Sequence, residues 1–204
     1  MEQYIIFAPV ASAIFAITLV VSLIAFYNEN WLRSMMLHPY SVSRGKRIYT
    51  IITSGLIHRD WMHLLFNMMS FYFFAFTLEA RYLGHWQFGL LYVASLILSD
   101  LPTVGKHRDD DWYHSLGASG AISAVVFSFI LFNPRTQMYL IFLPIPVSAW
   151  LFGALYLVYC VYASKQSRDS INHDAHFFGA ISGIMITILL NHHIISYFLQ
   201  QFGI

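Results

Sequence analysis

The chain has 204 residues, of which 58% are hydrophobic and only 10% are charged, and its mean hydropathy is +0.59. A soluble domain carries about a quarter charged residues, so this composition excludes an ordinary soluble domain and indicates a polytopic protein of the lipid bilayer. The net charge of +1 gives no reason to expect a nucleic-acid partner. The single Cys160 excludes a disulfide framework and a cysteine-based metal site.

Six apolar segments follow one another along the chain. The first, 5–27, lacks the basic start and the short apolar core of a signal peptide, so we expect a retained first transmembrane helix. Together the segments predict an all-α membrane protein of six transmembrane helices, with residues 1–204 forming a single domain. The five later segments are 61–83, 86–102, 117–132, 138–163 and 173–199.

The fourth segment is too short to cross the membrane fully. Its sixteen residues rise about 24 Å, against a hydrocarbon thickness of about 30 Å. Its N-terminal end is therefore expected below one membrane surface, inside protein or beside a water-filled cavity. That end reads Gly117-Ala118-Ser119-Gly120, a run that taken alone favours close helix packing but is compatible with a nucleophile whose negative charge faces free helix N–H groups.

The sixth segment carries His176, with Gly179 and Gly183 three and seven residues later on the same helix face. One interpretation is a histidine bonded to a neighbouring helix. The other is a general base, because neutral imidazole has a pKa near the working pH and a serine hydroxyl needs such a base. Asp174 stands only two residues away and points elsewhere on the helix, so a two-residue dyad is the simpler hypothesis.

The second segment carries His63 and Asn67, four residues apart and so on one helix face. Interhelical hydrogen bonding would explain the pair, and so would a set of donors for an oxyanion. With Ser119 and His176, the chain then has a candidate nucleophile, base and oxyanion donors on three different membrane segments.

Four motifs of this sequence resemble those of the rhomboid family of intramembrane serine proteases. The fourth segment is similar to the family's G-x-S-G motif, the sixth to A-H-x-x-G-x-x-x-G, and the start of the second to H-x4-H-x3-N. The end of the second segment is similar to the family's acidic residue followed by Leu-Gly. The matching stretches are GASG at 117–120, AHFFGAISG at 175–183, HRDWMHLLFN at 58–67, and Glu79 with Leu83-Gly84.

The resemblance implies a six-transmembrane-helix rhomboid-like bundle in which the short fourth helix carries the nucleophile. It further implies cleavage of transmembrane segments of other membrane proteins through an acyl-enzyme, with no metal and no cofactor. Substrate would enter sideways between helices, and the fifth segment, which holds Pro144 and Pro146, would be the gate. The implied roles are nucleophile for Ser119, general base for His176, oxyanion donors for His63, Asn67 and the backbone N–H of Ser119, and close-approach positions for Gly117, Gly120, Gly179 and Gly183.

The sequence departs from the family pattern at two places. Tyr49-Thr50 stands where many members have Trp-Arg, so the anchoring of the loop before the second segment is expected to differ. Ser123 stands where many members have a tyrosine that stacks on the catalytic histidine. Either His176 is less firmly oriented than in those members, or another aromatic ring takes that place.

The family arrangement puts both termini in the cytosol and opens the active site to the extracytoplasmic side. The minimal core suggests a bacterial inner membrane. The positive-inside rule predicts the reverse orientation, because nine of the eleven Lys and Arg residues fall in loops that would lie outside. We retain the family orientation as the expectation.

Two other functions are alternatives to an active protease. The ten histidines, in stretches such as HRDWMH and HDAH, resemble the histidine boxes of membrane metalloenzymes, but that hypothesis leaves GASG and Asn67 unexplained. A catalytically inactive rhomboid-like protein that binds and escorts membrane proteins is the second alternative. Such relatives typically lack the serine or the histidine, and this chain has both.

Overall fold

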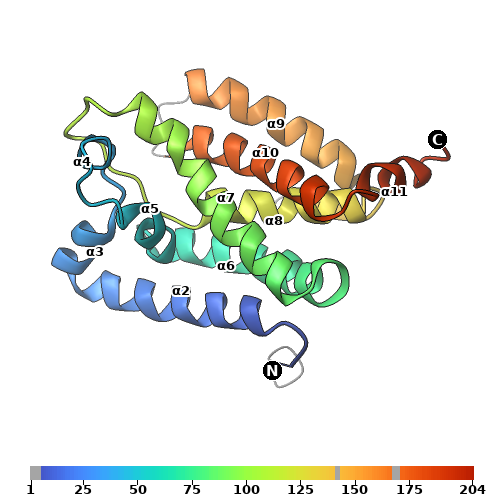
Figure 1. Ribbon diagram of the computed structural model, residues 1–204, viewed down its shortest axis with the longest axis horizontal. Coiled ribbons are helices and arrows are strands. Elements are labelled where there is room, and N and C mark those ends of the chain that lie inside the picture. The colour runs from blue at the N-terminus through green and yellow to red at the C-terminus, as the bar shows by residue number, and fades with distance from the viewer. Residues whose placement is uncertain (1–5, 141–142, 167–170) are drawn as a thin grey trace.

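The structure, a computed structural model, describes residues 6–140, 143–166 and 171–204. Long helices lie side by side in one bundle, with α2 on one flank and α9 on the opposite flank (Figure 1). This arrangement confirms the predicted all-α membrane class. The long helices are α2 (Pro9–Tyr27), α6 (Trp61–Leu78), α7 (His85–Lys106), α8 (Ser119–Phe132), α9 (Ala149–Gln166) and α10 (His173–Leu190).

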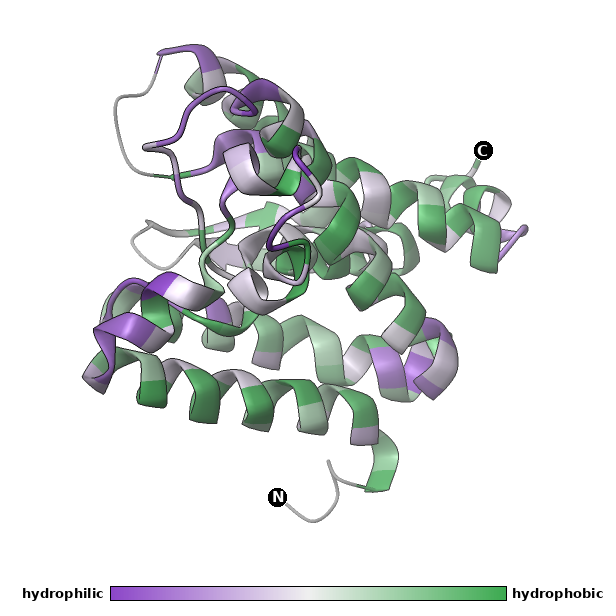
Figure 2. Ribbon diagram, turned by 60° about the vertical axis from the view of Figure 1, so that its left-hand side comes forward, coloured by the Kyte–Doolittle hydropathy of each residue, from purple (hydrophilic) through white to green (hydrophobic). Residues whose placement is uncertain are grey.

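Among the described residues, four helices are long and apolar enough to cross a bilayer, and α8, with 14 residues, is a shorter apolar helix as predicted. The long helices are coloured mostly as hydrophobic, while hydrophilic residues gather largely in the loops and at helix ends (Figure 2). The chain is a multi-pass membrane protein. The count of six spans stays a prediction that this arrangement accommodates. The four helices are Pro9–Tyr27, Trp61–Leu83, His85–Lys106 and His173–Leu190.

Helix α8 lies in the middle of the bundle and packs against α6, α7, α9 and α10. Its crossing with α10 is close because small residues meet there. A Cβ atom added to Gly179 would lie 2.8 Å from the carbonyl carbon of Gly120, and one added to Gly183 would lie 2.8 Å from that of Ala124. Without side chains between them, the two backbones approach to direct contact, as is common in membrane helix pairs.

A buried carboxylate fixes the start of α2. After α6 the chain continues as a π-helix, η2 (Glu79–Leu83), and Glu79 is fully buried. Its carboxylate accepts hydrogen bonds from the backbone N–H groups of Val10, at 3.0 Å, and Ala11, at 2.6 Å, and lies 2.7 Å from Nδ1 of His85. A negative charge at a helix N-terminus is favourable, and these donors compensate its burial.

The connection from α2 to α6 is folded over one end of the bundle and holds four short helices. Arg47, at φ +52°, donates from Nη2 to the carbonyl oxygens of Arg33, at 2.8 Å, and Ser34, at 3.0 Å. The loop is therefore anchored by an arginine that lies before the Tyr49-Thr50 position. The short helices are α3 (Glu29–Met35), α4 (Pro39–Val42), α5 (Thr50–Thr53) and the 3-10 helix η1 (Ser54–Leu56).

The predicted fifth segment, 138–163, was wrong in its first part. Instead of a helix, β1 (Gln137–Leu140) and β2 (Leu143–Ser148) pair as an antiparallel hairpin, and α9 begins only at Ala149. The reason is the two prolines of β2, which lack the N–H group that a helix interior needs but are tolerated in a strand at the edge of a sheet.

The predicted sixth segment, 173–199, is divided into two helices. Helix α10 ends at Leu190, and α11 (Ile194–Gln200) follows after a break. At the break the side-chain oxygen of Asn191 accepts a hydrogen bond from the backbone N–H of His193, at 3.2 Å. Asparagine side chains compete with helical hydrogen bonds in this way, which is why the apolar run does not stay one helix.

Candidate active site

Ser119 is the first residue of α8 and His176 lies in the first turn of α10. The Oγ atom of Ser119 lies 2.8 Å from Nε2 of His176, within hydrogen-bonding distance. The close crossing of α8 and α10 at Gly120 and Gly179 brings the two side chains together. When Nε2 is unprotonated, the hydroxyl donates to it, which is the contact that a serine nucleophile and its base require.

The sequence-predicted pair on α6 faces the same place. A Cβ atom added to Gly117 would lie 2.8 Å from Nε2 of His63 and 3.9 Å from Nδ2 of Asn67, so both side chains flank the chain two residues before Ser119. Gly117 has φ +118°, a conformation that favours glycine, and its N–H donates to the carbonyl of Ser54 at 2.9 Å.

The protonation of His63 suits a donor role. Its Nδ1 accepts a long hydrogen bond, 3.5 Å, from the backbone N–H of Arg59, so a neutral ring carries its proton on Nε2, the atom facing Gly117. Asp60 caps α6 by accepting the N–H of His63 at 2.8 Å, and this bond lowers the pKa of Asp60 below its ordinary value. The start of α6 is thus held by the residues just before it.

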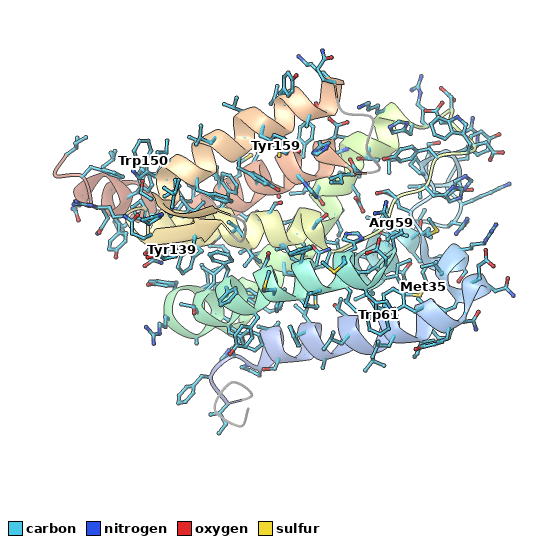
Figure 3. The ribbon with its side chains drawn as sticks, turned by 180° about the vertical axis from the view of Figure 1, so that it is seen from behind. Met35, Arg59, Trp61, Tyr139, Trp150 and Tyr159 are labelled. Carbon is cyan, nitrogen blue, oxygen red and sulfur yellow. The ribbon has the colours of Figure 1, made fainter. Side chains whose placement is uncertain are left out.

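One large cavity, about 1160 Å³ in volume, opens among the helices beside these groups. Ser119, His176, His63 and Asn67 all line it. Arg59, from the loop before α6, also lines the cavity and lies toward the loop-covered end of the bundle, opposite Tyr139 and Trp150 (Figure 3). The four predicted side chains therefore share one space within the bundle.

Asn172, which the sequence analysis missed, ties together the elements around the dyad. Its side-chain oxygen accepts the N–H of Ala175 at 3.1 Å and so caps α10. Its amide nitrogen donates to Oγ1 of Thr103 on α7 at 2.9 Å and to Oγ of Ser115 at 3.3 Å. An asparagine just before an apolar helix is a recognisable N-cap signal and would have indicated the first of these bonds.

Asp174 does not join the dyad. Its carboxylate lies 2.5 Å from Nζ of Lys106, at the end of α7. The expectation that Asp174 points away from Ser119 agrees with this contact. Among the described ranges, no group of three or more His, Cys, Asp or Glu side chains is placed to hold a metal ion.

His58 lies next to His63 and is fully buried, with its Nδ1 atom 2.9 Å from Oγ of Ser22 on α2. Its ring meets the ring of His63 edge-on, with centroids 4.9 Å apart. Burial is the largest cause that lowers the pKa of His58 well below 6.5, and the neighbouring His63 lowers it further. His58 therefore stays neutral in the folded protein at pH values where the unfolded chain binds a proton.

This difference predicts a pH-dependent stability. As the pH falls below 6.5, His58 takes up a proton only in the unfolded state, so the free energy of unfolding decreases. One such group contributes a slope of up to about 1.4 kcal/mol per pH unit. We expect His58→Asn to flatten the dependence between about pH 6 and pH 4, measured by reversible denaturation in detergent micelles. An unchanged slope in this variant would contradict the prediction.

A second feature missed from the sequence is Tyr156 on α9. Its ring lies near that of His176, with centroids 6.4 Å apart and an angle of 20° between the planes. Its hydroxyl lies 3.0 Å from Oγ of Ser123. The sequence shows only that Ser123 replaces the tyrosine that many family members have at this position, which leaves open that another aromatic residue stacks on His176.

Comparison with known proteins finds one matching family and several similar proteins. The family model described as the rhomboid domain matches residues 45–193. RHOMBOID-like protein 12, mitochondrial, of Arabidopsis thaliana is 27% identical over 168 residues, which are 76% of this chain and 50% of the relative. The Bacillus subtilis protein YdcA, provisionally named a rhomboid protease, is 29% identical over 194 residues, 92% of each chain.

A third relative, Rhomboid protein 1, mitochondrial, of Saccharomyces cerevisiae, is 28% identical over 146 residues, 67% of this chain and 40% of the relative. The chain thus spans half or less of the two mitochondrial relatives and nearly all of the bacterial one. The family match covers well over half of the chain and includes every motif residue of the site. The chain belongs to the rhomboid family.

Proposed function

We propose that this chain is an intramembrane serine endopeptidase that cleaves transmembrane segments of other membrane proteins. The single observation that carries the proposal is the 2.8 Å contact between Oγ of Ser119 and Nε2 of His176. The contact lies at the N-terminus of a short apolar helix and lines a cavity within the bundle. Family membership supports the same activity class.

In the proposed reaction, Nε2 of His176 takes the hydroxyl proton while Oγ of Ser119 attacks the peptide carbonyl carbon. The carbonyl oxygen becomes an oxyanion, which the backbone N–H of Ser119 and the side chains of His63 and Asn67 would hold. Collapse of this intermediate breaks the C–N bond, and His176 returns its proton to the leaving amine. A water molecule from the cavity then hydrolyses the acyl-enzyme by the same proton transfers, which restores Ser119.

Gly117 and Gly120 would serve this reaction because neither has a side chain that would collide with the groups beside Ser119. A side chain at Gly117 would meet His63, and a side chain at Gly120 would meet Ser99 and the carbonyl of Ala175. Both glycines let these neighbours approach the backbone beside Ser119 more closely than a side chain would allow. The reaction needs no group beyond those of the chain and water, so we propose no metal and no cofactor.

A substrate segment would reach the cavity from the bilayer past α9 and the hairpin that precedes it. Tyr156 and Phe152 of α9 and Met138 of β1 line the cavity on that side. Transmembrane protein segments are the substrates that such a lateral path admits. We keep the extracytoplasmic opening and the bacterial inner membrane as predictions, since the relatives come from a bacterium and from mitochondria.

An inactive escort protein of the same family is the remaining alternative. It would have no use for a serine and a histidine in hydrogen-bonding contact, and this contact favours the protease.

A covalent serine probe tests the proposal on the whole protein. In liposomes, a small fluorophosphonate is expected to label Ser119 only, because the neutral imidazole of His176 activates this hydroxyl. Mass spectrometry of the labelled protein identifies the residue, and Ser119→Ala should remove the label. Folded wild-type protein that neither takes up the probe nor cleaves any of several transmembrane substrates would favour the escort alternative.

A further inference from the structure

Tyr156 lines the candidate site and lies on α9, a helix that carries neither Ser119 nor His176. The plane of its ring lies at 20° to that of His176 with centroids 6.4 Å apart, within the range of about 4.5–7 Å for aromatic pairs in an offset arrangement. Two residues of α9 and α8 flank the same ring: Phe152, with centroids 5.9 Å away, and Phe127, with centroids 5.8 Å away.

The hydroxyl of Tyr156 fixes the ring along its length. It lies 3.0 Å from Oγ of Ser123, which is 6% exposed and one turn after Ser119 on α8. A tyrosine at position 123 would occupy the space that this hydroxyl now needs. The small side chain of Ser123 therefore makes room for the ring of Tyr156 and also forms a hydrogen bond with its hydroxyl.

We infer that Tyr156 is a positioning residue for His176, so that the dyad is fully organised while α9 is docked against α8 and α10. The inference rests on the proposed protease function and goes beyond it by assigning a residue and a condition. A ring packed against the imidazole restricts its rotation and keeps Nε2 directed at Ser119. A substrate segment that displaced α9 would also withdraw this ring, and the base would become fully positioned only when α9 returned.

The first test separates the ring from the hydroxyl. Tyr156→Met, which keeps an apolar side chain of similar length, is expected to lower kcat for a transmembrane substrate by about tenfold or more, because proton transfer depends on the orientation of the base, and to leave KM within about twofold. The rate of fluorophosphonate labelling should fall in parallel. Tyr156→Phe keeps the ring and should retain at least about a third of the wild-type kcat.

The control is Tyr162→Leu, on the same helix but 66% exposed and outside the cavity lining. It should leave kcat, KM and the labelling rate unchanged. Thermal unfolding of every variant in detergent shows whether lost activity follows lost fold. A kcat of Tyr156→Met within twofold of wild type, or an equal loss in Tyr162→Leu, would overturn the inference.

A double substitution keeps the test decisive even if Tyr156→Met unfolds easily. Ser123→Tyr combined with Tyr156→Met moves the ring from α9 to α8, where it would stand one turn after Ser119. The inference expects the double variant to exceed Tyr156→Met in labelling rate by about fivefold or more, since the imidazole regains a neighbouring ring. A double variant that melts like wild type and labels no faster than Tyr156→Met would refute it. Failure of wild-type protein to label or cleave would instead refute the protease function.

Discussion

Ser119→Ala and His176→Ala are each expected to lower the cleavage rate of a transmembrane substrate by at least about 10³-fold, with little change in substrate binding. Each variant removes one side of the 2.8 Å contact between Oγ and Nε2. Without the hydroxyl no acyl-enzyme can form, and without the imidazole the hydroxyl keeps its proton and remains a weak nucleophile. The measurement is single-turnover cleavage in liposomes with excess enzyme.

The two groups act as one unit, so the double variant should be no slower than either single variant. Ser128→Ala is the matched control: this serine is buried on the same helix, and its Oγ accepts a hydrogen bond from Oγ1 of Thr187 at 2.7 Å. It should affect stability alone. Cleavage that survives in Ser119→Ala would show that the nucleophile lies elsewhere.

Gly179→Ala is expected to destabilise the fold by about 1–3 kcal/mol, and to lower activity by more than that loss of folded protein explains. The added methyl group would lie 2.8 Å from the carbonyl carbon of Gly120 and 3.1 Å from its Cα atom. These neighbours are backbone atoms, which cannot rotate away, so α8 and α10 must separate. Their separation also lengthens the contact between Ser119 and His176. Denaturation in micelles, together with the labelling rate, measures both effects.

Gly105→Ala supplies the comparison, because an added Cβ atom at this glycine of α7 meets nothing within 4 Å. It should be neutral or slightly stabilising, since alanine favours helix more than glycine does. Wild-type stability in Gly179→Ala would mean that the two helices are farther apart than the structure places them.

The sequence indicates the principal residues of the candidate site because their chemistry is encoded in short, local spacings. His63 and Asn67 are one turn apart, and Gly179 follows His176 by three residues, so each group lies on one helix face wherever the helix packs. The resemblance to the rhomboid family then assigned these separate motifs to one site. Ser119 and His176 are 57 residues apart in the sequence, so only the packing of α8 on α10 determines the distance between their side chains.

Several of the missed features depend on contacts that no local pattern encodes. Residues 138–148 are mostly apolar, which predicts a helix, but the two prolines of β2 make strand pairing more favourable. Tyr156 is one of several aromatic residues on α9, and only the register of this helix against α8 selects it as the neighbour of Ser123. Arg47 finds its carbonyl partners through the fold of an irregular loop.

The carboxylate of Glu79 holds α2 rigidly on one flank of the bundle, whereas α9, on the opposite flank, has no such anchor among its described contacts. Sliding α2 by one residue would leave a fully buried negative charge without the N–H groups of Val10 and Ala11, a cost of several kcal/mol. The opposite flank, α9, is held to α8 largely by apolar and aromatic contacts and by a hydrogen bond between Tyr156 and Ser123, and such contacts exchange readily for lipid or for another apolar chain. A mechanical load on this protein, such as bilayer thinning, would therefore be relieved through α9 while α2 stays in place.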